Sequence, residues 1–193
     1  LVCFGGWEMV LVGAACVLFC FLYTTLLAQH GMGDVLVLLF FGLVPVCLTY
    51  YVTMPPASQT ITAQVVWASL ACGLVIDTLL VVNNYRDYDQ DRAVGKKTLI
   101  VRIGRERAEQ LYGWLGNIAT CMMWGCLVLG DPSFVLMLVC FACFVPYALL
   151  HGATRVQMRR IGRGRELNKV LGMTARNMFV FGVTTAIVTL FIL

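Results

Sequence analysis

Long apolar stretches alternate with short polar connections along the chain. Six stretches of about 20 residues carry almost no charge, and this is the length that a helix needs to cross the hydrocarbon core of a bilayer. Hydrophobic residues are continuous rather than alternating within each stretch, and regular turn signals are absent, which favours helices over barrel strands. The predicted helices cover residues 8–27, 34–54, 61–83, 109–129, 133–150 and 171–193.

Composition places the chain among integral membrane proteins. Hydrophobic residues make up 60% of it and charged residues 12%, and the mean hydropathy is +0.85, which lies outside the range of soluble globular domains. We therefore predict an all-α fold, a multi-pass transmembrane helical bundle, with residues 1–193 in a single domain. Because the chain opens in apolar sequence at Leu1, without an initiating Met or a basic leader, we interpret it as N-terminally incomplete.

The nine cysteines lie almost entirely within the apolar stretches, where cysteine behaves as a small hydrophobic residue. Cys140 and Cys143 form a CxxC pair, but this pair falls in the middle of an apolar stretch. Packing is therefore a better interpretation of it than metal or redox chemistry.

The basic residues predict the orientation of the bundle. All fourteen Lys and Arg residues fall in two connections, seven within residues 86–107 and seven within residues 155–176. Six helices would put both connections, and the connection at 28–34, on one face, and the bias of Lys and Arg makes this face cytoplasmic. We expect a multi-pass membrane protein whose polar cluster faces the cytoplasm. Topology and anionic lipid explain the net charge of +4, so no nucleic acid is expected as a partner.

The densest polar cluster, NNYRDYDQDRAVGKKTL at residues 83–99, follows the third apolar stretch directly. If the helix continued through its polar end, Asp77, Asn84, Asp87 and Asp91 would lie along one face. Asp87 and Asp91 are four residues apart, so both carboxylates can hold one hard divalent cation, with the Asn84 carbonyl oxygen one turn earlier. Mg²⁺ prefers such oxygen ligands together with a substrate phosphate. The alternative is a solvated helix end.

Cations follow the aspartates. Gly95 provides a bend before Lys96, Lys97 and Arg102, whose positive charges can meet a diphosphate. The string GKKT is not a phosphate-binding loop of the Walker type, because Gln90 stands where that loop needs its first glycine. For Lys97, a role as a topology signal is an equally good interpretation.

Asp77 lies two turns inside the apolar stretch, about 10 Å deeper than Asn84. An ionisable group at this depth is costly and by default faces a water-filled cavity or a partner within the bundle. A protonated or hydrogen-bonded aspartate with a structural role is the alternative, and both interpretations stay open.

The stretch NNYRDYDQDRAVGKKTLIVRIG, residues 83–104, resembles the second aspartate-rich motif of the UbiA superfamily of intramembrane prenyltransferases. The form NNxRDxxxDxxxGKxTLxVRxG is similar to that of 1,4-dihydroxy-2-naphthoate polyprenyltransferases. Further similarity lies in YTTLLAQHGMGDVLVLLFFGLVPVCLTYYV and in LNKVLGMTARNMF. The resemblance implies that the six helices correspond to helices 4 to 9 of a nine-helix fold. The first aspartate-rich motif of the family has no counterpart here, so we expect residues 1–193 alone to be inactive.

The resemblance implies transfer of a polyprenyl group from its diphosphate to 1,4-dihydroxy-2-naphthoate. Loss of CO₂ and diphosphate would give demethylmenaquinone, in menaquinone biosynthesis. Mg²⁺ held by Asp87, Asp91 and Asn84 would bind the diphosphate, and Lys96 would assist its departure. Tyr23, Tyr50 and Tyr51 are candidates for the aromatic wall that shields a carbocation from water, although tyrosine is equally common at membrane interfaces. The full set of expected substrate-binding residues is Asn84, Arg86, Lys97, Arg102, Asp77, Tyr23, Asp34 and Tyr50.

Three alternatives to this predicted function remain. Another acceptor, such as 4-hydroxybenzoate or a chlorophyllide, would keep the same chemistry. A cation-coupled transporter would use Asp77 and the loop carboxylates, but we find no internal repeat, and the acidic cluster lies at the membrane interface rather than at the midplane. A non-catalytic membrane scaffold gives no reason for so dense a polar cluster. The sequence carries no signal for the prenyl chain length or the oligomeric state.

Overall fold

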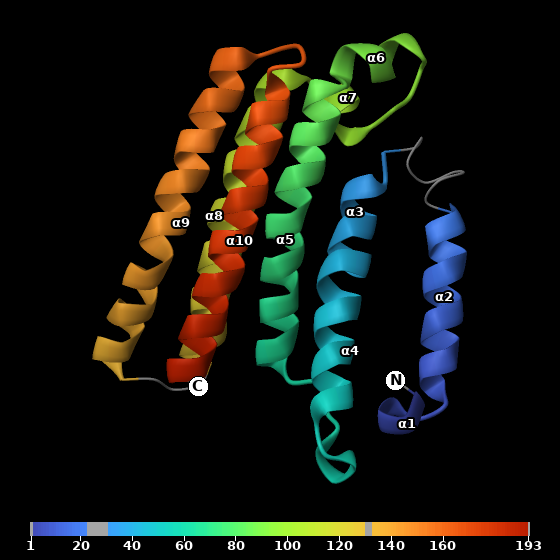
Figure 1. Ribbon diagram of the computed structural model, residues 1–193, viewed down its shortest axis with the longest axis vertical. Coiled ribbons are helices and arrows are strands. Elements are labelled where there is room, and N and C mark those ends of the chain that lie inside the picture. The colour runs from blue at the N-terminus through green and yellow to red at the C-terminus, as the bar shows by residue number, and fades with distance from the viewer. Residues whose placement is uncertain (1, 23–30, 130–132, 193) are drawn as a thin grey trace.

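The computed structural model describes residues 2–22, 31–129 and 133–192, and every regular element among them is helical (Figure 1). The long helices stand side by side with similar axes. The predicted all-α class is confirmed. The α-helices are α1 (Val2–Gly5), α2 (Glu8–Leu22), α3 (Gly33–Val37), α4 (Val44–Thr53), α5 (Ala63–Arg86), α6 (Tyr88–Ala93), α7 (Leu99–Ile103), α8 (Arg105–Val128), α9 (Phe134–Ile161) and α10 (Leu167–Ile192), with a π-helix η2 (Leu38–Leu43) and a 3₁₀ turn η3 (Pro56–Ser58).

Four helical segments of the described chain are long and apolar enough to cross a membrane, where the sequence predicted six. They are Gly33–Thr53, Ala63–Arg86, Phe134–Ile161 and Leu167–Leu190. Helix α2 is apolar but has only 15 residues, and part of its predicted continuation falls outside the described residues. Helix α8 opens with the charged sequence RERAEQ, so polar residues occupy part of its length.

Helix α5 lies at the centre of the bundle, and α8, α10 and the span 33–53 pack against it. Two buried apolar clusters hold these helices together. The first joins Ala71 and Val75 of α5 to Phe144 of α9 and Phe181 of α10. The second, nearer the polar end of α5, joins Val81, Val82, Tyr85, Tyr112, Met158, Leu167 and Val170.

The π-helix η2 crosses α5 at a glycine pair. A methyl group added at Gly42 would lie 2.7 Å from the Cα of Gly73 and 2.8 Å from the carbonyl oxygen of Ser69. The two backbones can approach this closely only because neither glycine has a side chain. The thiol of Cys47, one turn further along, donates a hydrogen bond to the Ser69 hydroxyl at 3.6 Å. This contact holds the span 33–53 tightly against α5.

Both basic connections lie at the same end of the bundle, as predicted. In Figure 1 this end contains α6, α7, the start of α3 and the connection between α9 and α10. Arg86 donates to the side-chain oxygen of Asn168 at 3.1 Å, and Arg105 donates to the carbonyl oxygen of Gly162 at 2.7 Å. The polar cluster and the second basic connection therefore form one continuous polar surface.

Candidate active site

The helix that carries the polar cluster breaks at Asp87, so the prediction of one continuous face from Asp77 to Asp91 is wrong. Helix α5 ends at Arg86, Asp87 has φ −88° and ψ 4°, and α6 starts at Tyr88. The Arg86 guanidinium donates two hydrogen bonds to the Asp87 carboxylate, at 2.7 and 2.8 Å. Adjacent side chains do not face each other on a regular helix, so this two-point pairing is incompatible with an uninterrupted helix.

Asp87 faces the connection between α9 and α10. Its cavity of about 450 Å³ is lined by Arg86, Gln90, Gly164, Arg165 and Asn168. Arg86 is the centre of this group, because it also donates to the side-chain oxygen of Asn83 at 2.9 Å. The side chains of Arg86 and Asp87 are both about 70% buried, with relative exposures of 28% and 29%.

Asp91 lies on α6 and is buried, with 8% of its surface exposed. The Lys96 ammonium donates to its Oδ1 at 3.3 Å, and the Lys96 backbone N–H donates to its carbonyl oxygen at 2.9 Å. Its Oδ2 is buried and has no hydrogen-bond partner within the described part of the chain. The turn that returns the chain to Lys96 contains Gly95 at φ +74°, where glycine is favoured. One carboxylate oxygen of Asp91 is therefore free to bind a ligand.

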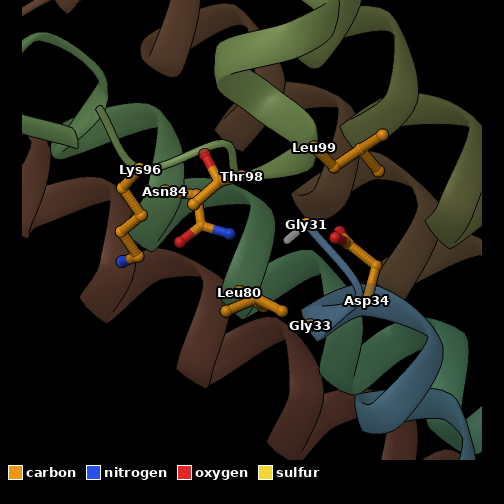
Figure 2. Close-up of a pocket in the computed structure, with 8 residues that line it drawn as sticks. All are labelled: Gly31, Gly33, Asp34, Leu80, Asn84, Lys96, Thr98 and Leu99. Atoms are coloured by element: carbon orange, nitrogen blue, oxygen red, sulfur yellow. The ribbon is translucent and has the colours of Figure 1, made fainter. Parts of the chain in front are cut away.

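A small polar cavity lies beside this turn (Figure 2). Its volume of about 20 Å³ accommodates one water-sized group. Three segments surround it: the loop before α3, the last turns of α5, and the stretch that leads into α7. Figure 2 shows Asp34 on one side of the cavity, with Asn84 and Thr98 across from it. The lining residues are Gly31, Gly33, Asp34, Leu80, Asn84, Lys96, Thr98 and Leu99.

Two local features position the walls of this polar cavity. Thr98 is the N-cap of α7, and its hydroxyl accepts a hydrogen bond from the backbone N–H of Val101 at 3.3 Å. Gly31 has φ +73°, and a methyl group added to it would lie 2.5 Å from the carbonyl oxygen of Lys97. The loop before α3 therefore packs directly on the GKKT stretch, and only glycine fits at position 31.

The structure brings some of the predicted site residues together and separates others. Asn84, Lys96 and Asp34 line the polar cavity, and Asp91 joins them through Lys96. Asp77 is 2% exposed, and its Oδ1 has no partner among the described residues. Arg86 and Asp87 line the neighbouring cavity instead.

The remaining predicted residues lie further out. Lys97 and Arg102 have exposed side chains close to the loop that contains Gly31. Tyr50 lies on α4, 16 residues after Asp34 and therefore about 24 Å along the same span, so the structure does not bring it to the polar cavity. Tyr51 is next to it, and Tyr23 lies outside the described residues.

Sequence reasoning assigned no role to Thr98, Gly31 or Asn168. Thr98 carries the signal of a helix N-cap, since it directly precedes the apolar LIV of α7. Asn168 binds Arg86 across 82 residues of sequence, and no local signal reports this contact.

The donor set fits Mg²⁺. Asp91 offers a buried, unpartnered carboxylate oxygen, and Asn84 offers a side-chain oxygen in the polar cavity that Lys96 also lines. Asp87 lies in the neighbouring cavity, where both of its carboxylate oxygens accept from Arg86. In the portion of the chain that the structure describes, no three His, Cys, Asp or Glu side chains are close enough to enclose a metal ion by themselves. This arrangement suits an ion that is held by one or two carboxylates together with water and a substrate phosphate, as Mg²⁺ commonly is.

Comparison with known proteins identifies the family. Residues 1–168 match the UbiA prenyltransferase family. The chain belongs to this family. This confirms the resemblance seen in the sequence motif, and it makes the chain a member of a prenyltransferase family rather than of a transporter or scaffold family.

The individual relatives compared with the chain share the same name. Over 187 residues the chain is 34% identical to 1,4-dihydroxy-2-naphthoate octaprenyltransferase of Mycobacterium tuberculosis. The aligned region covers 92% of this chain and 58% of the relative. Over 119 residues it is 33% identical to the Escherichia coli protein of the same name. This aligned region covers 62% of this chain and 32% of the relative. The chain thus spans less than two thirds of the length of these relatives. No solved structure matches it significantly.

Proposed function

We propose that this chain belongs to a Mg²⁺-dependent enzyme that transfers a polyprenyl group from its diphosphate to 1,4-dihydroxy-2-naphthoate. The transfer releases diphosphate and CO₂ and gives demethylmenaquinone. The observation that carries the proposal is the meeting of Asp91, Lys96 and Asn84 at the polar end of α5, directly beside an apolar groove. Membership of the UbiA family and the names of the relatives support it.

The polar residues bind the diphosphate in this proposal. Bound Mg²⁺ supplies positive charge that offsets the negative charge developing on the leaving diphosphate. Asp91 and Asn84 would hold the ion beside the polar cavity, and Asp87 would reach it from the neighbouring cavity, with its carboxylate oriented by two hydrogen bonds from Arg86. The Lys96 ammonium lies at the edge of the polar cavity and donates to an oxygen of the diphosphate. Lys97 and Arg102, whose side chains are exposed near the loop that contains Gly31, add positive charge at the surface of the site.

The apolar groove binds the tail of the donor and excludes water. It has a volume of about 600 Å³ and runs between the span 33–53, α5 and α10. Leu80 lines both this groove and the polar cavity, so the two spaces adjoin. A prenyl cation formed at this junction meets apolar walls, which limit its capture by water. The groove is lined by Val37, Phe41, Ile76, Leu79, Leu80, Asn83, Leu171, Gly172 and Ala175.

The membrane placement is also part of the proposal. The end of the bundle with α6, α7 and both basic connections faces the cytoplasm of a bacterial cell, because basic connections favour that side. In this proposal α2 and α8 join the four long apolar segments, and the six together correspond to helices 4 to 9 of the nine-helix family fold. This places the diphosphate site at the aqueous surface and leaves the groove at membrane depth.

An acceptor competition tests the proposed function. The protein expressed from its complete gene is reconstituted in lipid with Mg²⁺ and polyprenyl diphosphates of several lengths. It is then given 1,4-dihydroxy-2-naphthoate and 4-hydroxybenzoate in equal amounts, and products are identified by mass spectrometry. Demethylmenaquinone is the expected product. Prenylation of 4-hydroxybenzoate alone would overturn the choice of acceptor, and absence of any prenylated product would overturn the enzyme assignment.

A further inference from the structure

Two buried aspartates lie where the span 33–53 packs against α5, and one of them lines the polar cavity. Asp34, in the first turn of α3, is 8% exposed, and Asp77, in the middle of α5, is 2% exposed. Asp34 lies one turn before Leu38, and Asp77 lies one turn after Gly73. Leu38 packs against Gly73 where the two segments cross in opposite directions, so the two aspartates lie at the same level of the bundle. Each Oδ1 is buried and lacks a hydrogen-bond partner in the region that the structure describes.

This arrangement is costly unless something binds there. A buried carboxylate oxygen without a donor loses its hydration and gains nothing in return. Lys96 lines the same cavity as Asp34, but its ammonium is directed to Asp91. A ligand with hydrogen-bond donors would satisfy both free oxygens, so the pair points to a ligand that carries hydroxyl groups.

The space around the pair fits a hydroxylated ring. The polar cavity beside Asp34 holds one water-sized group, such as a hydroxyl, but no ring. The apolar groove, with about 600 Å³, is large enough for an aromatic ring system. Ile76 and Leu80, which flank Asp77 on α5, both line this groove. Asp34 lines the adjoining polar cavity, and Asp77 is buried next to Ile76 on α5, so hydroxyl groups of a ring in the groove would reach the two aspartates through the junction at Leu80.

We propose that Asp34 and Asp77 bind the ring hydroxyl groups of the aromatic acceptor and so determine which acceptors the enzyme uses. This inference rests on the proposed prenyl transfer and names the acceptor part of the same site. Aspartate side-chain oxygens accept hydrogen bonds from phenolic hydroxyls, and a site built around such bonds discriminates steeply against a ligand that lacks the hydroxyl. The acceptor class is an electron-rich aromatic compound with at least two hydrogen-bond donors.

The test pairs deletion of a side chain with deletion of a hydroxyl. The reconstituted protein from the complete gene is assayed for turnover of 1,4-dihydroxy-2-naphthoate, and 1-hydroxy-2-naphthoate, which lacks one hydroxyl, is added as a competitor. The inhibition constant reports binding and is independent of ring reactivity. We expect the wild type to bind the dihydroxy compound at least about tenfold more tightly than the monohydroxy compound.

In Asp34→Ala or Asp77→Ala the preference between the two compounds should fall toward one. The KM for the polyprenyl diphosphate should stay unchanged in Asp77→Ala, because Asp77 does not line the polar cavity that contains Asn84 and Lys96. The Asn variants, which keep one acceptor oxygen, should recover part of the preference. Asp89→Ala is the matched control, because the Asp89 side chain is 61% exposed and pairs with Arg105 on the surface. This variant should keep the wild-type preference.

The outcomes separate the two proposals. A wild-type enzyme that turns over the dihydroxy acceptor but binds both compounds equally would overturn this inference and leave the proposed function intact. The same holds if both Ala variants keep the wild-type preference. A wild-type enzyme without prenyl transfer to any aromatic acceptor would overturn both. If an Ala variant does not fold, the Asn variant of the same residue is measured instead, and a wild-type preference in the Asn variants of both residues would overturn the inference.

Discussion

Replacing Gly42 by alanine tests the close crossing of η2 and α5, on which the position of Asp34 depends. The new methyl group would lie 2.7 Å from the Cα of Gly73 and 2.8 Å from the carbonyl oxygen of Ser69. Carbon atoms in favourable contact are about 3.5–4.0 Å apart, so the two helices must separate locally by about 1 Å. Both obstructing atoms belong to the backbone, so no side-chain rotation can relieve the clash.

The size of the effect follows from two opposing contributions. Overpacking of this kind costs about 1–3 kcal/mol. Alanine is the better helix former by roughly 0.5–1 kcal/mol, which offsets part of that cost. A net loss of about 1–2 kcal/mol should lower the Tm by roughly 2–8 °C for a chain of this size. Asp34 lies two turns away on the same span, so the KM for the aromatic acceptor should also rise.

The assay is thermal unfolding in detergent together with acceptor kinetics on the same preparation. Gly182→Ala is the matched control, because Gly182 lies within α10 and a methyl group added there would have no neighbour within 4 Å. This control should keep or slightly raise the Tm. A Gly42→Ala protein with the Tm and acceptor KM of the wild type would refute the reasoning, since it would show that the two helices do not cross at these glycines.

Three further predictions concern the polar end of the bundle. Asp91→Asn and Asp87→Asn should each lower kcat by at least about a hundredfold at an unchanged Tm, because each removes a ligand for Mg²⁺; near-normal turnover in both would exclude the metal site. Gly31→Ala should lower the Tm more than Gly95→Ala, since both residues have positive φ but only the first methyl group clashes with the Lys97 carbonyl; equal effects would contradict that contact. Arg86→Lys should reduce turnover about tenfold or more, because lysine cannot make the two-point pairing with Asp87; full activity would show that this pairing is dispensable.

Much of the fold and part of the site are encoded locally and could be predicted. Continuous apolar stretches indicated helices, and the density of charge after the third stretch indicated the polar end of α5, where the ligand site is proposed. The turn from Asp91 to Lys96 was also accessible, because Gly95 marks it and the residues are five apart. The break at Asp87 was not, since periodicity assumes that a helix continues. It occurs where Arg86 pairs with Asp87, and one further partner of Arg86, Asn168, is 82 residues away.

The burial of Asp34 shows most clearly what sequence alone leaves open. An acidic residue in the first turn of a helix is common on exposed surfaces, where it interacts favourably with the helix dipole. Asp34 is buried because two contacts distant in sequence hold the start of α3 against α5 and the GKKT stretch: Gly42 on Gly73, and Gly31 on Lys97. Hydrophobic periodicity shows that helices pack but not which glycines meet. These glycines lack side chains that bind a substrate, yet the distance between Asp34 and the residues of α5 depends on them. A substitution of Gly31 or Gly42 should therefore change acceptor binding, as a substitution of Asp34 should.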